Sequence, residues 1–344
     1  MKDIKFGNII IGKTTPVVVI AEIACEHMGN MENAKELIRM AKNVGADIAK
    51  FQLHIPEIEM VPNVINFWAG SLDKILAKVN IGEKEQHKEL MKYCNEIGIQ
   101  YLCTPFCIEA SDILDEIGVK AFKTGSGEMT NLTMIRHIAK KRKPMIVSTG
   151  MCTMDEIRET VAVLKEEGVD FVLTNCTSEY PANYEHLNLN LINILEKEFG
   201  ILIGHSDHTK EIYSSIAAVA LGARVIEKHF TIRDLHGPDD LVSLDPEEFK
   251  ELVSAIRKVE KTLFSEKNIT KEEQDVRDWA HHSVIAKDDI GAGEVVGAHN
   301  LRAARPGTGI PAKFLDKIFS EGLFGRKTKH DIAKNAILQW NDLE

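Results

Sequence analysis

Two lysines stand inside segments that otherwise have the composition of buried strands. Lys50 lies in DIAKFQLH and Lys123 lies in AFKTGS. Burying an ammonium group is costly unless a partner compensates its charge, so each lysine requires an anion nearby. A structural interpretation supplies that anion from a neighbouring carboxylate such as Glu22 or Glu128. Two chemical interpretations are an anionic substrate, or a lysine of lowered pKa that forms an imine.

Hydroxyl side chains end several of the same segments. They are Thr104, Ser126, Ser148 and Ser206. Lysines, hydroxyls and glycine-flanked backbone amides together form a site for phosphate, or for a compound that carries both phosphate and carboxylate. We therefore favour electrostatic binding of such an anion over an imine and over a purely structural ion pair.

Two histidines end consecutive predicted strands, His208 in GHSDHT and His229 in IEKHFT. The ends of adjacent parallel strands lie close together, so the two imidazoles could converge. Two imidazoles that leave coordination positions open to oxygen ligands suit Mn²⁺, Fe²⁺, Co²⁺ or Mg²⁺. The alternative is a pair of hydrogen-bonded structural histidines.

Further polar side chains stand near the ends of the same apolar segments, where a substrate could contact them. They are Glu22, Gln52, Glu128, Asn175, Tyr180 and Glu227. A carboxylate such as Glu22 is either a structural partner of a lysine or a group that contacts substrate. Glu128 and Asn175 are predicted to bind substrate from their position alone.

The segments that carry these residues are short, apolar and rich in β-branched residues. There are eight of them, at 17–24, 48–53, 99–106, 121–126, 144–150, 171–178, 201–208 and 224–230. Segments with apolar residues three and four apart lie between them, and 246–264 would be the eighth such helix. Apolar strands alternating with helices indicate a parallel sheet covered on both faces. Eight repeats favour a (β/α)8 barrel over an open doubly wound sheet, and such barrels carry their chemistry at the carboxyl ends of the strands.

The two ends of the chain differ from this repeat. The segment IKFGNIIIGKTTP predicts a small hairpin that could close the base of the barrel. We assign residues 1–264 to the barrel catalytic domain with this N-terminal hairpin. The charged stretch 265–280 is predicted to be an irregular linker. Residues 281–344, with short strands and turns, are predicted to form a separate small domain.

The 344 residues are 44% hydrophobic and 27% charged, a globular composition with a substantial core. The net charge of −10 argues against nucleic acid as a partner. No apolar run is long enough for a membrane span and the N-terminus lacks a secretory signal, so we expect a cytoplasmic protein without a membrane partner. The six cysteines show no disulfide pattern, and we interpret Cys103 and Cys107 as buried thiols rather than a zinc site.

Several segments together resemble the sialic acid synthase family, which comprises N-acetylneuraminate synthases and their legionaminate and pseudaminate relatives. The matching segments are AEIACEHMGNMENA, GADIAKFQLH, CTPF, AFKTGSGEMTN, PMIVSTGM, NCTSEYP, HSDHT, ALGARVIEKHFT, GPDDLVSLDPEEF and ARPGTGI. The resemblance implies a (β/α)8 TIM barrel followed by a small C-terminal antifreeze-like (SAF, β-clip type) domain. It also implies a domain-swapped homodimer in which each C-terminal domain caps the barrel of the partner.

The resemblance implies an activity as well. Phosphoenolpyruvate and water would react with an N-acylated hexose, typically N-acetylmannosamine, to give a nine-carbon 2-keto acid and phosphate. A divalent metal would activate the sugar aldehyde, with Mn²⁺ expected and Mg²⁺ or Co²⁺ as alternatives. No covalent enzyme intermediate would be needed.

The site residues that the resemblance implies fall into three groups. Phosphoenolpyruvate would be held by Lys50, Thr104, Lys123, Ser126, Ser148, Ser178 and Ser206. The metal would be held by His208 and His229, and Glu22 would position or exchange protons with the reacting centre. The sugar would be held by Gln52, Tyr180, Asp239 and Arg305.

Three departures from the family pattern leave the acceptor sugar open. Ser178 stands where some bacterial members carry asparagine, EHMGN replaces the more common NH-x-G, and 61–79 has no convincing match. The acceptor is N-acetylmannosamine, a di-N-acetylated 6-deoxyhexose or a 6-phosphorylated sugar. The other classes we considered are a sugar-acid synthase without the C-terminal domain, a metal-dependent barrel hydrolase, and a carbohydrate- or ice-binding protein.

Overall fold

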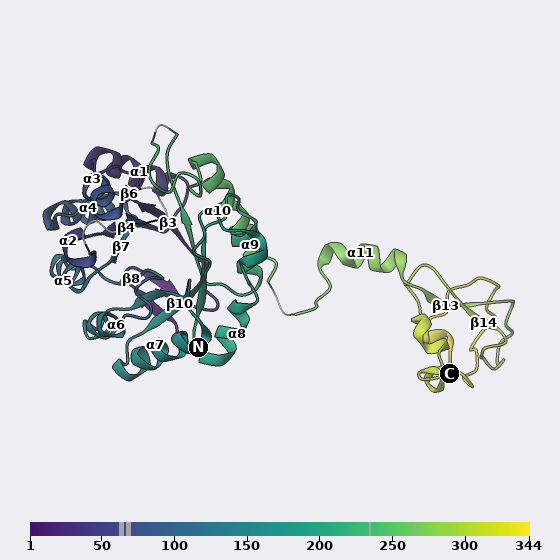
Figure 1. Ribbon diagram of the computed structural model, residues 1–344. Coiled ribbons are helices and arrows are strands. Elements are labelled where there is room, and N and C mark those ends of the chain that lie inside the picture. The colour runs from purple at the N-terminus through teal and green to yellow at the C-terminus, as the bar shows by residue number, and fades with distance from the viewer. Residues whose placement is uncertain (62–64, 67–69, 234, 264–265) are drawn as a thin grey trace. The chain divides into compact units, whose positions relative to one another are not determined.

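The computed structural model describes residues 1–61, 65–66, 70–233, 235–263 and 266–344, with the side chains of 65–66 and 70–72 left out. The chain divides into two compact units, Met1–Phe264 and Ser265–Glu344 (Figure 1). We predicted a boundary between the barrel domain, 1–264, and the linker, 265–280; residues 264 and 265 themselves lie outside the described residues.

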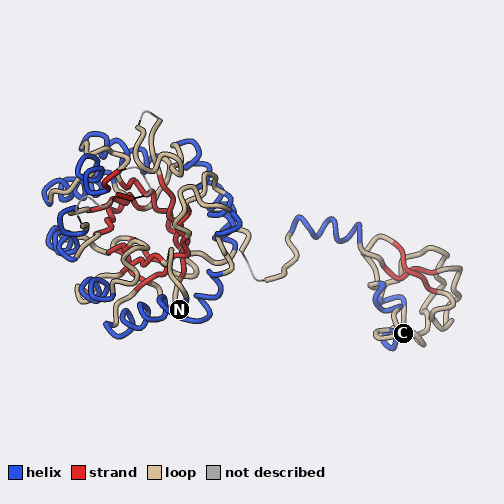
Figure 2. The backbone as a smooth tube through the Cα atoms, viewed as in Figure 1, coloured by secondary structure: helices blue, strands red, loops and turns tan. Residues whose placement is uncertain are grey.

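The first unit is built on one parallel sheet. Its strands are β3 (Val18–Ala24), β4 (Ile48–Leu53), β7 (Gln100–Pro105), β8 (Phe122–Thr124), β9 (Met145–Ser148), β10 (Phe171–Cys176), β11 (Ile203–Asp207) and β12 (Val225–His229). They pair in the order β7-β4-β3-β12-β11-β10-β9-β8, and the end strands β7 and β8 contact each other. The sheet therefore curls into a near-closed ring, as Figure 2 shows, and the predicted TIM-barrel fold is confirmed.

Helices surround this ring (Figure 2). They are α1 (Met31–Asn43), α4 (Lys84–Ile97), α5 (Ile108–Ile117), α6 (Leu132–Ala139), α7 (Met154–Glu167), α8 (Leu191–Phe199), α9 (Tyr213–Ala220) and α10 (Pro246–Glu260). Between β4 and α4 the chain forms α2 (Pro56–Glu59), β5 (Ile65–Asn66), β6 (Gly70–Ser71) and α3 (Leu72–Val79). A short 3₁₀ helix, Tyr184–His186, follows β10. Part of the unassigned segment 61–79, residues 62–64 and 67–69, lies outside the described residues.

The predicted N-terminal hairpin is present and packs on the barrel. Strands β1 (Ile4–Phe6) and β2 (Ile9–Ile11) pair antiparallel. Phe6 and Ile11 are fully buried in one apolar cluster with residues from the first halves of the barrel strands, such as Val18 and Val225. A second and larger cluster fills the space between the sheet and the helices. The base of the barrel is thus closed by apolar packing.

Side chains alternate along each strand, and this alternation places the polar residues. On β3, Val18 and Ile20 belong to the cluster at the base, and Glu22 is the next residue on that face. On β12, Val225 is followed on the same face by Glu227 and His229. The interior of the barrel is therefore apolar at the amino ends of the strands and polar at their carboxyl ends.

The second unit has its own small core. It contains α11 (Lys271–Ala280), β13 (Ser283–Ala286), β14 (Leu301–Ala304) and the 3₁₀ helices Ala312–Leu315, Ser320–Gly322 and Trp340–Asp342. Strands β13 and β14 pair antiparallel, and buried residues such as Val284, Leu323 and Leu338 form the core.

The prediction of an irregular linker at 265–280 was wrong over most of its length. Helix α11 begins after Thr270, whose side chain accepts a hydrogen bond from the backbone of Glu273 while the Glu273 side chain bonds back. This capping box stabilises the first turn even though no residue of the helix is buried. Only Val276, Trp279 and Ala280 of its ten residues are apolar, which is why the sequence pattern did not reveal the helix.

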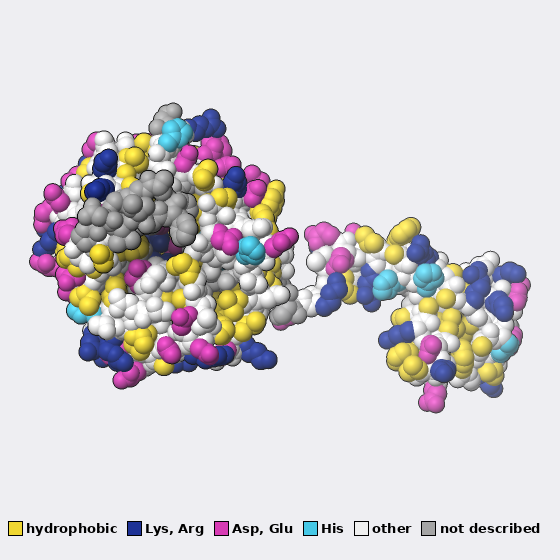
Figure 3. Space-filling view, in the orientation of Figure 1, with side chains coloured by type: hydrophobic (Ala, Val, Ile, Leu, Met, Phe, Trp, Pro, Cys, Tyr) yellow, Lys and Arg dark blue, Asp and Glu magenta, His cyan; other side chains and the backbone are white. Residues whose placement is uncertain are grey.

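Three further findings concern both units of the chain. None of the helices in the described ranges is long and apolar enough to cross a membrane. All six cysteines are free thiols. Acidic and basic side chains are mixed over the face seen in Figure 3.

Candidate active site

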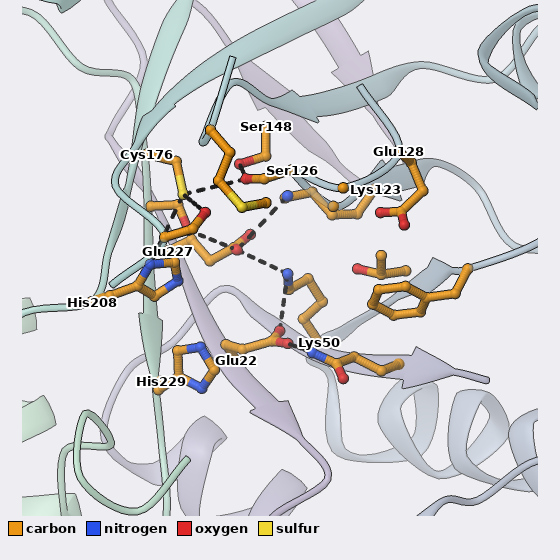
Figure 4. A pocket seen from close by; sticks show the side chains of 18 of the residues that line it. Glu22, Lys50, Lys123, Ser126, Glu128, Ser148, Cys176, His208, Glu227 and His229 are labelled. Carbon is orange, nitrogen blue, oxygen red and sulfur yellow. Dashed lines mark hydrogen bonds and ion pairs between the residues drawn. The ribbon is translucent and has the colours of Figure 1, made fainter. Parts of the chain in front are cut away.

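A cavity of about 340 Å³ lies at the carboxyl ends of the barrel strands (Figure 4). It is lined by Glu22, Lys50, Gln52, Thr104, Phe106, Lys123, Gly125, Ser126, Gly127, Glu128, Ser148, Met151, Cys176, Ser178, Tyr180, Ser206, His208, Glu227 and His229. Every barrel strand, or the loop that directly follows it, contributes to this lining. The structure thus brings together all predicted site residues except Asn175, Asp239 and Arg305.

The two buried lysines converge on Glu227 (Figure 4). Lys50 Nζ lies 2.8 Å from Glu227 Oε1 and 3.0 Å from Glu22 Oε2, and Lys123 Nζ lies 3.8 Å from Glu227 Oε1. Lys123 also donates a hydrogen bond of 2.8 Å to the carbonyl of Thr124. Glu227, which the sequence analysis named as a polar strand-end residue but did not pair with the lysines, is therefore the central anion. Glu128 forms no ion pair with Lys123 in the described structure.

Burial and charge give Glu22, Glu227 and Lys123 different proton affinities. Burial raises the pKa of Glu22 to about 7, against the opposing charge of Lys50. Burial also favours the neutral form of Glu227, but Lys123 and Lys50 outweigh it and lower the pKa of Glu227 to about 2. Burial, together with the charge of Lys50, lowers the pKa of Lys123. Glu227 is therefore a fixed anion, whereas the Glu22 carboxyl exchanges its proton near neutral pH, which suits proton transfer.

Serine side chains from neighbouring strands form a polar wall beside the lysines. Ser126 Oγ lies 2.9 Å from Ser148 Oγ, and Ser206 Oγ donates to Glu227 Oε1 at 3.0 Å. Gly150 follows Ser148 and must lack a side chain, because a Cβ there would stand 2.4 Å from Ser178 Oγ and 2.5 Å from Ser126 Oγ. The loops therefore bring three hydroxyls close enough together to share one oxyanion group.

His208 and His229 face each other with ring centroids 5.4 Å apart. His208 Nδ1 lies 2.8 Å from the carbonyl of Thr177, which requires a proton on Nδ1, and Nε2 lies 3.1 Å from Tyr180 Oη. Burial opposes the charged form of His208, but Cys176 and the Thr177 carbonyl outweigh it and raise the pKa of His208, so a metal ion would have to displace a proton from Nε2. His229 Nδ1 is buried without a hydrogen-bond partner and lies 3.6 Å from Asp239 Oδ2. Burial keeps the pKa of His229 well below its usual value, so its imidazole is neutral.

These features fit two metal ligands. His208 donates its Nδ1–H to a backbone carbonyl, the usual orientation of a metal-ligating histidine, and its Nε2 would bind the ion in place of the contact with Tyr180. His229 is neutral and has an unpartnered ring nitrogen, Nδ1. The described residues contain no group of three or more histidine, cysteine or carboxylate side chains that could hold an ion. A metal bound here would therefore take its remaining ligands from substrate and water.

Three predicted site residues lie elsewhere. Asn175 was predicted to bind substrate, but it is outside the cavity lining and its side chain donates to the carbonyl of Leu187 at 3.1 Å. The reason is the alternation on β10: Cys176, the next residue, faces the cavity, so Asn175 faces the helices. Asp239 lies just beyond His229, outside the cavity. Arg305 belongs to the second unit, where its Nε donates to the carbonyl of Ala280, and its role in sugar binding stays a prediction.

Cys176 is a cavity residue that the sequence interpretation missed. Its Sγ lies 3.9 Å from His208 Nδ1 and 3.5 Å from Ser126 Oγ. Burial alone would raise the pKa of this thiol, but its interaction with His208 lowers it to about 6. Its place two residues before Ser178 in the predicted strand 171–178 was the available signal, because residues two apart on a strand share a face.

A chain of hydrogen bonds orients Gln52. Its Nε2 donates to Glu22 Oε1 at 3.0 Å, and its Oε1 lies 3.0 Å from His54 Nε2. The other ring nitrogen of His54 lies 2.7 Å from Glu59 Oε1, and the ring stacks on Phe106 with centroids 4.0 Å apart. His54 thereby fixes which end of the Gln52 amide faces Glu22. The sequence interpretation assigned no role to His54.

Glu26 positions the loop that carries Asp239. Its carboxylate accepts the backbone N–H groups of Gly237 at 3.1 Å and Asp239 at 2.8 Å. A Cβ on Gly237 would stand 2.5 Å from this carboxylate, so the approach requires glycine. Burial raises the pKa of Glu26 to about 7. The residue that departs from the family pattern in EHMGN is therefore a structural anchor beside the site.

A near-closed barrel with lysines, carboxylates, histidines and hydroxyls gathered in one cavity at its strand ends has the layout of a (β/α)8-barrel enzyme. The family model of the NeuB family matches residues 37–268, and that of the SAF domain matches residues 281–344. The chain therefore belongs to the NeuB family and carries a C-terminal SAF domain, as its motifs predicted.

Individual relatives agree with this assignment. An uncharacterized protein of Methanocaldococcus jannaschii is 41% identical over 346 residues, which cover 100% of this chain and 99% of the relative. N,N'-diacetyllegionaminic acid synthase of Campylobacter jejuni is 39% identical over 318 residues, 88% of this chain and 95% of the relative. The crystal structure of N-acetylneuraminic acid (sialic acid) synthetase from Leptospira borgpetersenii, in complex with citrate, is 31% identical with a TM-score of 0.73, covering 80% of this chain and 95% of that chain.

Proposed function

We propose that this protein condenses phosphoenolpyruvate with an N-acylated hexose and water, giving a sialic-acid-type nine-carbon 2-keto acid and phosphate. The observation that carries the proposal is the convergence of Lys50 and Lys123 on Glu227 beside a wall of serine hydroxyls. Ammonium and hydroxyl donors in a buried cavity match an enol that carries both phosphate and carboxylate. The family and the legionaminic acid synthase relative support the same reaction class.

The reaction forms one carbon–carbon bond and exchanges the C2–O bond to phosphate for a C2–O bond to the oxygen of water. C3 of phosphoenolpyruvate attacks the aldehyde carbon of the open-chain sugar, and the aldehyde oxygen takes up a proton to become a hydroxyl. Water adds to the electron-poor C2, which gives a tetrahedral intermediate that still carries the phosphate. The C2–O bond then breaks, phosphate leaves, the C2 hydroxyl loses its proton, and the 2-keto group forms.

The residues of the cavity divide this work. Lys50, Lys123 and the serines hold the phosphate and carboxylate groups and stabilise the charge that they carry through the reaction. Glu22, with its pKa of about 7, is placed to exchange a proton with the reacting centre. Gln52 and Tyr180 line the side of the cavity on which the sugar would approach. A divalent ion on His208 and His229, Mn²⁺ in our proposal, would polarise the aldehyde.

The imine alternative is less well supported. Glu22 and Glu227 favour the protonated form of Lys50, which is not nucleophilic. The pKa of Lys123 is lowered, so Lys123 is the lysine for which borohydride trapping separates the two mechanisms. The homodimer and the cytoplasmic location that the sequence suggested stay predictions.

The direct test is a phosphate-release assay with phosphoenolpyruvate, Mn²⁺ and N-acetylated hexoses, with mass spectrometry of the product. We expect phosphate release that depends on the sugar. With ¹⁸O in the bridging oxygen of phosphoenolpyruvate, the label should leave with phosphate because the C2–O bond breaks. Release of phosphate without a sugar, retention of the label in the keto acid, or trapping of a lysine adduct by borohydride would contradict the mechanism.

A further inference from the structure

A second hollow, which we call the apolar groove, adjoins the cavity and has a volume of about 580 Å³. Its apolar lining comes from Met28, Ile75, Val79, Pro238, Leu241 and Val242. These residues belong to the loop after β3, to helix α3 and to the loop after β12. Met28 and Leu241 are among the exposed large hydrophobic residues, with Leu241 67% exposed. Exposed apolar side chains gathered around one hollow indicate a binding surface.

The apolar groove is continuous with the reacting end of the cavity. Tyr180 lines both hollows, and its ring lies 4.2 Å from His208 and 5.7 Å from His229, centroid to centroid. Asp239, which lines the groove, lies 3.6 Å from His229. A sugar whose aldehyde carbon lies beside the two histidines therefore has the groove within reach of its other end.

The charge of the apolar groove disfavours a phosphate group. Among the described residues, no lysine or arginine lines it, and Asp239 contributes a carboxyl. His236 also lines the groove, but its Nδ1 already lies 3.3 Å from Asp240 Oδ2. The backbone N–H groups of Gly237 and Asp239 could otherwise bind an anion, but the Glu26 carboxylate already accepts both. A sugar phosphate placed here would meet carboxyl groups and apolar side chains instead of the donors that it requires.

We propose that the apolar groove binds the far end of the acceptor sugar and selects an unphosphorylated hexose whose methyl groups, from acetamido or 6-deoxy substituents, contact Met28, Val79 and Leu241. This inference rests on the proposed function and narrows its substrate class. A methyl group that enters an apolar pocket changes specificity by about tenfold or more. A di-N-acetylated 6-deoxyhexose is therefore the preferred acceptor.

The test compares three acceptors in the phosphate-release assay: N-acetylmannosamine, its 6-phosphate and a di-N-acetylated 6-deoxyhexose. We expect kcat/KM for the deoxyhexose to exceed that for N-acetylmannosamine by about tenfold or more, with the 6-phosphate lowest. Preference for the 6-phosphate, or equal use of all three, would overturn this inference and leave the proposed function standing. No phosphate release with any acceptor would overturn the proposed function and this inference with it.

The variant Leu241→Lys sharpens the test, because Leu241 is exposed and its replacement should leave the fold intact. The new ammonium should raise KM for the deoxyhexose about tenfold and narrow the discrimination against the 6-phosphate, while KM for phosphoenolpyruvate stays unchanged. The matched control is Ile194→Lys, at another exposed apolar residue, on α8. Equal effects of the two variants on acceptor choice, or no effect of Leu241→Lys, would show that the groove does not contact the sugar.

Discussion

The cavity and the apolar groove meet at Tyr180 but are built in different ways. Cavity side chains stand on paired strands: Glu22 is the ladder partner of both Lys50 and His229, and Ser206 is that of Glu227. Groove side chains come from loops and from helix α3. The sheet therefore holds the chemistry rigidly, whereas the loops that select the acceptor can vary without disturbing it.

The two regions also differ in how strongly their groups depend on one another. Lys50, Lys123 and Glu227 are almost fully buried, and each charge is compensated by the others. Removing one leaves an uncompensated charge in the protein interior. Leu241 is exposed and has no such partner to lose. Substitutions should therefore reduce turnover most in the cavity, and should mainly alter acceptor binding at the groove.

The largest effect is expected for Lys123→Met. The methionine occupies the buried position without the ammonium group, so kcat/KM should fall about 10³-fold because the substrate anion loses a preorganised donor. Lys50 still compensates Glu227, so circular dichroism should show a folded protein. The matched control Lys140→Met, at an exposed lysine, should retain wild-type activity. Equal activity of the two variants would mean that Lys123 is only structural.

Metal removal comes next. A chelator should lower the rate at least about 10²-fold, since no other group in the cavity replaces a Lewis acid at the aldehyde. Adding Mn²⁺ back should restore the rate. Adding Mg²⁺ or Co²⁺ instead tests whether other divalent ions support activity. His229→Ala should be inactive in Mn²⁺ and should show no Mn²⁺ binding by calorimetry. Full activity after chelation would remove the metal from the proposal.

Glu26→Ala should change the loop that lies between the cavity and the apolar groove. It frees the backbone of Gly237 and Asp239, so the loop that borders the groove loses its anchor. We expect KM for the acceptor to rise about tenfold, the usual size of a lost positioning contact, with KM for phosphoenolpyruvate unchanged. Glu26→Gln keeps one acceptor oxygen, so its KM for the acceptor should lie between those of the wild type and Glu26→Ala. A parallel rise in both KM values would indicate a general loss of structure instead.

The smallest effect is expected for His54→Ala. Gln52 keeps its bond to Glu22 but loses the partner that orients its amide, so kcat/KM should fall by about tenfold or less. Steady-state kinetics with both substrates measure this. His299→Ala, at an exposed histidine, serves as control. A loss as large as that of Lys123→Met would assign His54 a direct part in the reaction.

Much of the cavity was predictable because it depends on alternation along single strands. Lys50, Lys123, His208 and His229 were found from polar types at the ends of apolar segments, and all four line one cavity. The same rule fails when the register is off by one residue. Asn175 was chosen where Cys176 faces the cavity, because composition alone does not say which of two neighbours points inward.

The amino-acid sequence by itself determined the barrel, its polar end and most of the groups around the cavity, since periodicity and residue type are local properties that each strand carries on its own. Only the tertiary structure decided that Glu227 lies between the two lysines and that Glu26 anchors Gly237 and Asp239. It alone also brought Met28 and Leu241 to one groove. These contacts join segments far apart in the chain, and their geometry depends on the packing of loops, which no short-range pattern specifies.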